Sequence, residues 1–349
     1  MKILYIGDSN INCTSYHRYT ALKRIGHDVD IFDPSKVIKQ LQHPIYSKFH
    51  YTTGFSFISK SIDKWLLGIV SQNLSIELVW INGGEFFNTN SLNILRRLQC
   101  PIILYNNDDP TGKRDGNRFK TLIKTIPAYD LCVVVRDTSK NEFKNLKAKN
   151  VLQMFMSSDE IAHKPLDSNS KIKPEFKSDI AFIGTWMRHE KRDEFILELI
   201  NKGLNVAIWG NRWQKSTFWN ELKGFYRGGG ISGDNYVAAI QGSKICLGLL
   251  SKGNRDLHTT RSLEIPYAGG LLCAERTTEH LALYEEGEEA VFWSDVDECA
   301  SICKQLLADD ALRERIRLNG MKRVRLNKVG NEDICREVLA EVEKIRENR

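Results

Sequence analysis

Two charged side chains in the second half of the chain are spaced so that together they could bind an anionic ligand. Arg261 and Glu264 lie three residues apart and therefore share one face of a helix that we expect to end near Ala268. Thr259 or Thr260 can cap its start, where free backbone N–H groups and the helix dipole favour an anion such as a diphosphate. The Glu264 carboxylate can accept hydrogen bonds from a ribose diol. The alternative interpretation is a solvated ion pair between Arg261 and Glu264.

Polar residues also follow most of the apolar runs in this chain. If these runs are strands of open parallel sheets, ligands bind beyond their carboxyl ends. In the second half of the chain the residues there are basic, glycine or tryptophan for the most part: Gly184, Thr185, Trp186, Arg192, Gly210, Arg212 and Lys252. In the first half they are mostly acidic or amides: Asp8, Ser9, Asn82, Gly84, Glu85, Asn107, Asp108, Asp109 and Arg136. This asymmetry suits a diphosphate on the second half and a hydroxyl-rich acceptor on the first.

The types of these residues predict a group transfer without a metal. Arg192 and Lys252 are further phosphate ligands, because cationic side chains can neutralise a departing nucleotide. If the reaction inverts configuration, a carboxylate must take the proton of the acceptor hydroxyl, and the candidates in order are Asp109, Asp108 and Glu85. A retaining reaction needs no such base, and the three carboxylates would then only position the acceptor. The two aspartates before a proline could equally form a capped turn.

Motifs for metals and dinucleotides are weak. Asp-x-Asp patterns occur at residues 28–30 and 295–297, but the first enters a strand and the second resembles a surface turn. A Gly-x-Gly-x-x-Gly pattern at residues 228–233 lacks the flanking strand and helix that a dinucleotide fingerprint needs. Cys299 and Cys303 share a helix face without His or Cys companions at zinc spacing. We therefore expect neither a metal nor a cofactor.

Short apolar runs alternate with helical patterns through both halves of the chain. The runs are KILYIG, DVDIF, ELVWI, PIILY and LCVVV, then DIAFIGT, LNVAIWG, KICLGLL, GLLCAE and AVFW. This alternation predicts an α/β protein with two doubly wound parallel-sheet domains. Residues 164–179 are polar, contain two prolines and indicate the linker. The last segment, with Ile334, Val338, Val342 and Ile345 at helical spacing, must pack against one of the domains.

The composition is that of an ordinary folded protein, and 349 residues suit two domains. No apolar run approaches the length of a membrane span, and the first residues enter a strand rather than a leader peptide. We expect a cytoplasmic protein that at most visits the inner face of the membrane. The formal charge of +6 is modest, and the basic run at residues 313–325 is better explained as a solvated helix face than as a nucleic-acid site.

The segment from Asn254 to Arg276 resembles the nucleotide-sugar site of GT-B glycosyltransferases, in which an acidic residue, seven further residues and a glutamate open a helix that ends at glycine. Asp256 and Glu264 keep this spacing, with Asp in place of the usual first Glu. The stretches YNNDDP, IPAYDLCVVVR, FIGTW, IWGNRW and RSLEIPYAGGLLCAERTTEH, in this order, resemble the CgeB-like (spore maturation protein) glycosyltransferases. Residues 157–166, SSDEIAHKPL, resemble the interlobe segment of GT-B enzymes.

The resemblance implies two Rossmann-like domains that face a cleft. Residues 1–165 would form the acceptor domain, residues 166–330 the donor domain, and residues 331–349 a helix that packs back on the first domain. The implied reaction transfers a sugar from a nucleoside-diphosphate donor, most simply a UDP-sugar, to a hydroxyl of a glycan, lipid-linked or protein acceptor. Glu264 would bind the ribose, while Arg261 with the amides of Thr259 and Thr260 would bind the diphosphate.

Two other functions fit the same architecture. A nucleotide-sugar epimerase would need acidic or histidine side chains around the sugar ring, for which His189, His258 and His280 are available. A sugar-nucleotide or glycan-binding protein would retain the scaffold without catalysis. A dinucleotide oxidoreductase is the least favoured.

Overall fold

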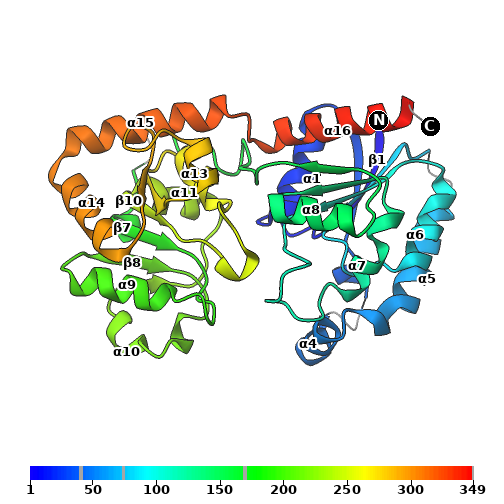
Figure 1. The fold of residues 1–349 in the computed structure, drawn as a ribbon, viewed down its shortest axis with the longest axis horizontal. Helices are drawn as coiled ribbons and strands as arrows, with labels where there is room; N and C mark the ends of the chain where they lie inside the picture. The colour runs from blue at the N-terminus through cyan, green and yellow to red at the C-terminus, as the bar shows by residue number, and fades with distance from the viewer. Residues whose placement is uncertain (39–41, 73–74, 168–170, 348–349) are drawn as a thin grey trace. The chain divides into compact units, whose positions relative to one another are not determined.

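The computed structural model describes residues 1–38, 42–72, 75–167 and 171–347 of the chain. The chain divides into two compact units, of which the first is coloured blue to green with a red C-terminal helix, and the second green to orange, in Figure 1. The first consists of Met1–Phe155 and Asn331–Arg349, and the second of Met156–Gly330. Residues 156–165 therefore belong to the second unit and not, as predicted, to the first. Hydrogen bonds explain the difference, because the backbone N–H of Ser158 donates to Val329 (3.1 Å) inside the second unit.

The first unit is built on a six-stranded parallel sheet with the order β2-β1-β3-β4-β5-β6. Its strands are β1 (Lys2–Ile6), β2 (Asp28–Phe32), β3 (Leu78–Asn82), β4 (Ile102–Asn106), β5 (Leu131–Val134) and β6 (Val151–Gln153). Its helices are α1 (Thr14–Arg24), α2 (Pro34–Val37), α4 (Pro44–Thr52), α5 (Ser59–Val70), α6 (Thr89–Leu95), α7 (Lys120–Thr125), α8 (Asp137–Asn145) and α16 (Asn331–Glu347).

The second unit repeats this plan with the strand order β12-β11-β10-β7-β8-β9, again parallel throughout. Its strands are β7 (Ser178–Ile183), β8 (Val206–Trp209), β9 (Tyr226–Gly228), β10 (Ser243–Gly248), β11 (Leu272–Glu275) and β12 (Val291–Trp293). Its helices are α9 (Arg192–Asn201), α10 (Trp219–Leu222), α11 (Gly233–Gln241), α12 (Arg261–Tyr267), α13 (Thr278–Leu283), α14 (Val296–Ala308) and α15 (Asp310–Leu326).

Both faces of the first sheet are covered, as a doubly wound fold requires. Along β1, Leu4 and Ile6 pack into one hydrophobic core while Ile3 and Tyr5 pack into the other. Successive side chains of a strand point to opposite faces, so a continuous apolar run of this kind places residues in both cores. The prediction of two doubly wound parallel sheets is confirmed.

Two strands were not predicted because they are not apolar throughout. β6 has the sequence VLQ and β9 the sequence YRG, and none of their residues is fully buried. β9 ends at Gly228 and α11 begins at Gly233, so the glycine pattern is flanked by a strand and a helix after all. β9 is nevertheless the edge strand of its sheet, and β10, which follows α11, pairs with β7 instead. The pattern therefore lies outside the β-α-β unit that a dinucleotide fingerprint requires.

The last helix, α16, belongs to the first unit. Ile334, Cys335, Val338 and Val342 are buried in the core that also contains Ala21 and Leu22 of α1. Arg24 of α1 forms an ion pair with Glu332 (2.7 Å) at the start of α16. The spacing of the apolar residues had predicted the buried stripe of this helix.

Two loops of the second unit approach so closely that one of them requires glycine. A Cβ atom at Gly210 would lie 1.9 Å from the carbonyl oxygen of Gly184, and the Gly210 φ is +150°. We expect Gly210→Ala to lower the free energy of unfolding by at least about 3 kcal/mol, from backbone strain and the clash together. Chemical denaturation will measure this loss.

Gly228 offers a matched control for that substitution. Its φ is +151°, but a Cβ atom at this position would have no neighbouring heavy atom of the described residues within 4 Å. Gly228→Ala therefore reports the backbone strain alone, for which we expect a loss of about 1–3 kcal/mol. Equal losses in the two variants would contradict the close approach of the loops.

Candidate functional site

The carboxylate of Glu264 is buried in the second unit, at the start of α12. Glu264 is 3% exposed, accepts a hydrogen bond from Tyr236 Oη (2.8 Å) and forms an ion pair with Arg261. Nε2 of His163 lies 3.6 Å from its Oε1 atom. Burial alone would raise the pKa of Glu264, but the charge of Arg261 and the contacts with His163 and Tyr236 outweigh it and lower the pKa to about 2. The pair is thus buried rather than solvated, and Glu264 is a carboxylate at neutral pH.

Arg261 links this carboxylate to the end of a central strand. Its Nε atom donates to the carbonyl oxygen of Ile183 (3.1 Å), the last residue of β7. Its guanidinium lies 4.6 Å from the centre of the Tyr236 ring, which adds a cation–π contact. The side chain remains 33% exposed. Arg261 therefore places a fixed, partly accessible cation at the carboxyl edge of the sheet, where ligands of such folds bind.

His163 and Tyr236 complete this cluster, and sequence reasoning did not find them as site residues. The backbone N–H of Asp159 donates to Nδ1 of His163 (2.8 Å), so the proton of the neutral imidazole is on Nε2, which faces Glu264. Neither residue has a spacing relation to Glu264 in the sequence. Only the resemblance of residues 157–166 to an interlobe segment pointed to that part of the chain.

The loops that follow β7 and β8 lie against each other beside Arg261. Trp213 Nε1 donates to the carbonyl oxygen of Gly184 (2.9 Å), and the Trp186 N–H donates to that of Asn211 (2.9 Å). The structure thus brings together five of the predicted donor residues, Gly184, Thr185, Trp186, Gly210 and Arg261. Arg212 also lies in these loops, where its side chain is exposed and its φ is +68°.

Arg192 is bonded to the backbone of two loops. It is 9% exposed, and its guanidinium donates to the carbonyl oxygens of Thr185 (2.9 Å) and Leu250 (3.0 Å). These bonds connect the loop after β7 with the loop after β10. Arg192 therefore positions two loops of the candidate site, whereas the sequence had suggested a direct phosphate ligand.

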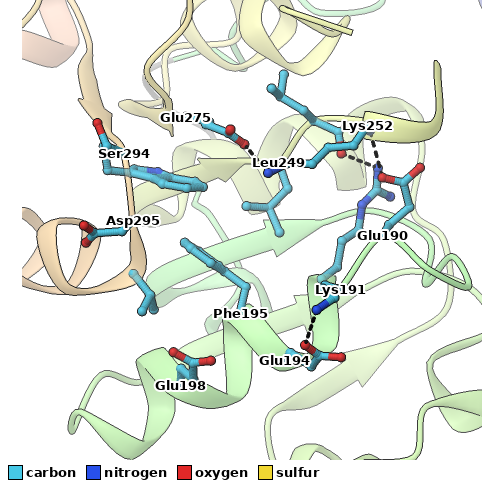
Figure 2. A pocket seen from close by; sticks show the side chains of 14 residues that line it. Glu190, Lys191, Glu194, Phe195, Glu198, Leu249, Lys252, Glu275, Ser294 and Asp295 are labelled. Atoms are coloured by element: carbon cyan, nitrogen blue, oxygen red, sulfur yellow. Dashed lines mark hydrogen bonds and ion pairs between the residues drawn. The ribbon is translucent and has the colours of Figure 1, made fainter. Parts of the chain in front are cut away.

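Lys252 lies in a pocket of about 350 Å³ whose rim is acidic (Figure 2). Its Nζ atom pairs with Glu275 (3.2 Å), and its backbone N–H donates to Glu190 (2.8 Å). Two aromatic rings of the lining, Phe195 and Trp293, stack on each other with their centres 4.5 Å apart. Five carboxylates and three cations line this pocket: Glu190, Glu194, Glu198, Glu275 and Asp295, with Lys191, Arg192 and Lys252. An excess of carboxylates disfavours a diphosphate, so this pocket does not support the phosphate role predicted for Lys252.

The start of α12 also differs in detail from the prediction. The N–H of Thr259 donates to Ser262 Oγ (3.1 Å) and is therefore already used within the chain. Thr260 is the N-cap residue but makes no side-chain capping bond. Asp256, the first acidic residue of the spaced pair, is buried with 6% exposure. The diphosphate role that we assigned to this turn consequently depends on Arg261 more than on the Thr259 amide.

His258 and His280, both buried in this unit, are held by internal hydrogen bonds. His258 Nε2 accepts from the N–H of Met156 (2.8 Å), and its Nδ1 lies 2.5 Å from Glu279. His280 Nδ1 donates to the carbonyl oxygen of Glu275 (2.6 Å), and its Nε2 accepts from Ser262 Oγ (2.7 Å). Both rings therefore support the fold around α12. This arrangement gives no support to an epimerase that uses either ring as an acid or base.

His280 should make the protein sensitive to mild acid. Burial lowers the pKa of His280 from 6.5 to about 4. Because the unfolded chain then binds the proton more tightly, stability that is complete above pH 6.5 is lost as the pH falls toward 4, by up to about 3 kcal/mol. Urea unfolding across this pH range will measure the loss, and His280→Asn should show a flatter dependence. His189→Asn, in an exposed loop, is the control, and an unchanged slope in His280→Asn would contradict the assignment.

A second candidate pocket, of about 310 Å³, lies in the first unit beyond the ends of β1 and β3. Glu85 and Asp108 line it and share one cation, because Arg118 lies 2.8 Å from Glu85 and 3.2 Å from Asp108. Burial raises the pKa of Asp108 above its usual value, although Arg118 counteracts this. A carboxylate whose pKa is raised toward neutrality is a better general base. Asp8 and Asn82 line the same pocket.

Asp109, the first of the predicted bases, is a turn residue in the structure. It is 3% exposed, and its Oδ1 atom accepts hydrogen bonds from the N–H of Gly112 (3.1 Å) and from Thr111 Oγ1 (3.3 Å). This is the capped turn that the sequence offered as the alternative. The order of the candidate bases therefore changes, with Asp108 and Glu85 ahead of Asp109.

The remaining predicted acceptor residues support the pocket from outside. Arg136 donates to the carbonyl oxygens of Asn107 (2.8 Å) and Asp108 (2.9 Å), which fixes the loop that carries the candidate base. Ser9 donates to Asp33 through its N–H (3.0 Å) and its hydroxyl (2.9 Å). Gly84 has a φ of +89° and lies against Leu104, so it shapes the backbone beside Glu85. Sequence reasoning missed Arg118, which lies in an irregular segment without periodic spacing.

Two further features of the sequence acquire partners in the fold. Cys273 of β11 joins Cys299 and Cys303, and the three buried sulfur atoms lie within 4.8 Å of one another, which spacing alone did not reveal.

In the basic run of α15, several arginines pair with carboxylates: Arg313 with Asp310, Arg315 with Glu288, Arg317 with Glu314 and Arg323 with Glu289. These pairs reduce the positive charge that the run presents, in line with a solvated helix face. In the parts of the chain that the structure describes, no helix is both long and apolar enough to cross a membrane.

Comparison with known proteins defines the class to which this fold belongs. Residues 188–339, somewhat less than half of the chain, match the protein-family model described as Glycosyl transferase-like. This match includes α12 with Arg261 and Glu264. A search of curated proteins found no match. Residues 188–339 of the chain thus form a glycosyl transferase-like domain, which contains β8 to β12 of the second sheet and the start of α16.

Solved structures with the same fold are glycosyltransferases of the GT-B type. Sucrose-phosphate synthase from Thermosynechococcus elongatus has a TM-score of 0.70 at 13% identity, with both chains covered completely. HepE from Anabaena, in complex with UDP, has a TM-score of 0.64 at 10% identity, covering 98% of this chain and 100% of the other. The α,α-trehalose 6-phosphate synthase from Burkholderia multivorans has a TM-score of 0.63 at 11% identity, covering 99% and 97%. The protein therefore has the GT-B fold.

Proposed function

We propose that this protein is a metal-independent glycosyltransferase of the CgeB-like type. It would move a sugar from a nucleoside-diphosphate donor, most simply a UDP-sugar, to a hydroxyl of a glycan, lipid-linked or protein acceptor. The observation that carries the proposal is the buried Arg261–Glu264 pair at the carboxyl end of β7, inside the region that matches the glycosyl transferase-like family. The solved structure of HepE holds UDP on the same fold, which supports a uridine nucleotide.

In the proposed donor complex, Glu264 accepts hydrogen bonds from the ribose diol, and Arg261 binds the diphosphate. Burial keeps Glu264 fixed by Tyr236 and His163, and the charge of Arg261 keeps it ionised, so its carboxylate is a strong and pre-oriented acceptor. Arg261 neutralises the charge that develops on the leaving nucleotide, which removes the need for a metal. The cationic side chain is fixed before the reaction and costs no reorganisation.

In the proposed acceptor complex, the pocket of Glu85 and Asp108 receives the hydroxyl-bearing end of the acceptor. Asp108 takes the proton of the attacking hydroxyl. The positive charge of Arg118, which pairs with both Asp108 and Glu85, offsets the repulsion between the two carboxylates. Asp8 and Asn82 offer further hydrogen bonds to hydroxyl groups. We place the reaction in the cytoplasm, where nucleotide sugars would be available.

Donor turnover in the presence of a chelator tests the proposal. The protein is incubated with UDP-glucose, UDP-galactose and UDP-N-acetylglucosamine in EDTA, and released UDP is followed with a coupled assay. We expect one donor to be hydrolysed slowly in the absence of an acceptor and to release UDP. The rate of UDP release should be the same with and without EDTA. Conversion of a donor to its epimer without UDP release would identify an epimerase. Binding without any turnover, even with a mixed acceptor extract, would identify a binding protein.

A further inference from the structure

The first unit exposes a patch of large apolar side chains around α4. Among the described residues, half of the large hydrophobic side chains that are exposed lie between α2 and α5: Val37, Ile45, Tyr46, Phe49, Phe57 and Leu67. Phe57 and Ile45 are 70% and 73% exposed, and the rings of Phe49 and Phe57 lie 5.4 Å apart. We call these six residues the apolar patch. Exposed apolar side chains gathered in this way usually mark an interaction surface.

A groove of about 750 Å³ opens beside the apolar patch. Phe32, Val37, Ile38, Trp65 and Ile69 line it with apolar surface, and Lys64 lies at the same groove. Val37 is one of the six residues of the apolar patch and also lines the groove. The volume is within the range of pockets that bind small molecules, and the apolar lining suits a hydrocarbon chain.

The groove and the acceptor pocket adjoin the same short segment of the chain. Both are lined by the short segment that follows β2: Phe32, Val37 and Ile38 line the groove, while Asp33, Pro34 and Ser35 line the acceptor pocket. A polar pocket and an apolar groove thus share one wall.

The segment that carries the patch is rich in lysine. From Pro34 to Gln72 the sequence contains five lysines and one carboxylate, Asp63. Lys36, Lys48, Lys60 and Lys64 are exposed. Asp63 accepts hydrogen bonds from Asn90 (2.7 Å) and Ser91 (2.6 Å) at the start of α6, so it is occupied within the fold. Apolar and aromatic side chains surrounded by lysines are the pattern of a surface that binds an anionic bilayer.

We propose that the acceptor is a lipid-linked molecule taken from an anionic membrane. In this proposal, which rests on the proposed function, the head group enters the acceptor pocket and the hydrocarbon chain lies in the groove. The apolar patch inserts into the head-group region, and the four lysines contact anionic lipids. α4 lies at the end of the first unit that is opposite α1 and α16, so these two helices leave this surface uncovered (Figure 1). The arrangement selects the lipid-linked class from the three acceptor classes given above.

Binding to vesicles with brominated acyl chains tests the groove directly, because Trp65 lines it. The vesicles contain phosphatidylcholine with about a third phosphatidylglycerol, since anionic lipid is needed to attract lysines. We expect the protein to float with these vesicles and its tryptophan fluorescence to be quenched by the bromine atoms. When the two proteins are compared at equal amounts of vesicle-bound protein, Trp65→Phe should lose most of the quenching. Binding without a contribution from Trp65 would overturn the role of the groove.

Substitutions on the patch test the membrane surface, with matched controls on α15. We expect Phe49→Ser with Phe57→Ser to lower the vesicle partition coefficient by about tenfold or more, and Lys48→Glu with Lys60→Glu to have a similar effect. Leu326→Ser and Lys322→Glu change exposed residues of the same kinds on α15 and should leave binding unchanged. All are surface changes, and circular dichroism will verify the fold. Equal losses in patch and control variants, or no vesicle binding by the wild type, would overturn the proposal.

The vesicle experiment and the donor experiment fail independently. Vesicle binding needs no nucleotide, so its absence leaves the glycosyltransferase proposal intact and excludes the lipid-linked acceptor. If vesicles bind through the patch but no donor is turned over, the membrane surface stands and the proposed reaction fails. If a protein extract competes with the vesicles for the patch while Trp65 is not quenched, the occupant is a protein rather than a lipid.

Discussion

Glu264→Gln should weaken the binding of the nucleoside diphosphate by about a hundredfold. The substitution keeps the shape of the side chain but removes the charge that strengthens its hydrogen bonds to the ribose diol, and two such bonds account for a loss of this size. It also removes the charge opposite the largely enclosed Arg261, so we expect the free energy of unfolding to fall by about 3 kcal/mol. Isothermal titration calorimetry and denaturant unfolding will measure the two effects.

Tyr236→Phe separates these two effects. It removes the hydrogen bond to Glu264 but leaves the charge of the Arg261–Glu264 pair in place. We expect about 1–2 kcal/mol of lost stability, with nucleotide affinity within about threefold of the wild type. If Glu264→Gln and Tyr236→Phe weaken nucleotide binding equally, Glu264 has no direct contact with the donor and the cluster is structural only.

Asp108→Asn should lower kcat by about a hundredfold to ten-thousandfold while donor affinity stays unchanged. The amide cannot accept the proton of the acceptor hydroxyl, and general base catalysis contributes an acceleration of this order. Because burial raises the pKa of Asp108, the pKa that governs the fall of the rate at low pH should be higher than the usual pKa of an aspartate. Initial rates with a saturating donor, across the pH range, will measure both.

Asp109→Asn is the internal comparison, because it makes the same change, from carboxylate to amide, at the neighbouring residue. Asp109 caps the turn at Gly112, so we expect a loss of about 1 kcal/mol in stability and less than about tenfold in kcat. A large loss of kcat in Asp109→Asn with a normal Asp108→Asn would restore the original order of the candidate bases. Small effects in both, with Glu85→Gln also active, would indicate a retaining reaction that needs no base.

The alternation of apolar runs and helical patterns was enough to predict both sheets. It worked because parallel strands that are buried on both faces appear as continuous apolar runs, as in β1 and β4. It failed for β6 and β9, whose sequences VLQ and YRG include polar residues or glycine and are only partly buried, whereas the equally short edge strand β12 (VFW) was predicted. The domain boundary was placed too late because the linker after residue 164 is polar, whereas residues 156–163 already bond to the second unit.

The candidate site was predictable where its residues lie close together in the sequence. Arg261 and Glu264 share a helix, so spacing and resemblance identified them together. His163, Tyr236 and Arg118 approach the site from distant segments, and only the fold brings them there. Spacing also cannot show whether a polar residue faces a ligand or the protein itself. For this reason Arg192, Asp109 and Arg136 were identified as site residues but proved to hold loops in place.

The donor site is tested most directly by a thermal-shift titration without added metal. Wild type and Glu264→Gln are titrated with UDP, GDP, TDP, CMP, NAD and the corresponding nucleotide sugars. We expect one nucleoside diphosphate, most simply UDP, to stabilise the wild type by about 2.7 kcal/mol at a hundredfold excess over its Kd, and to shift the variant far less. If no nucleoside diphosphate shifts the wild type, or if NAD alone does, the assignment of this protein as a nucleotide-sugar glycosyltransferase is contradicted.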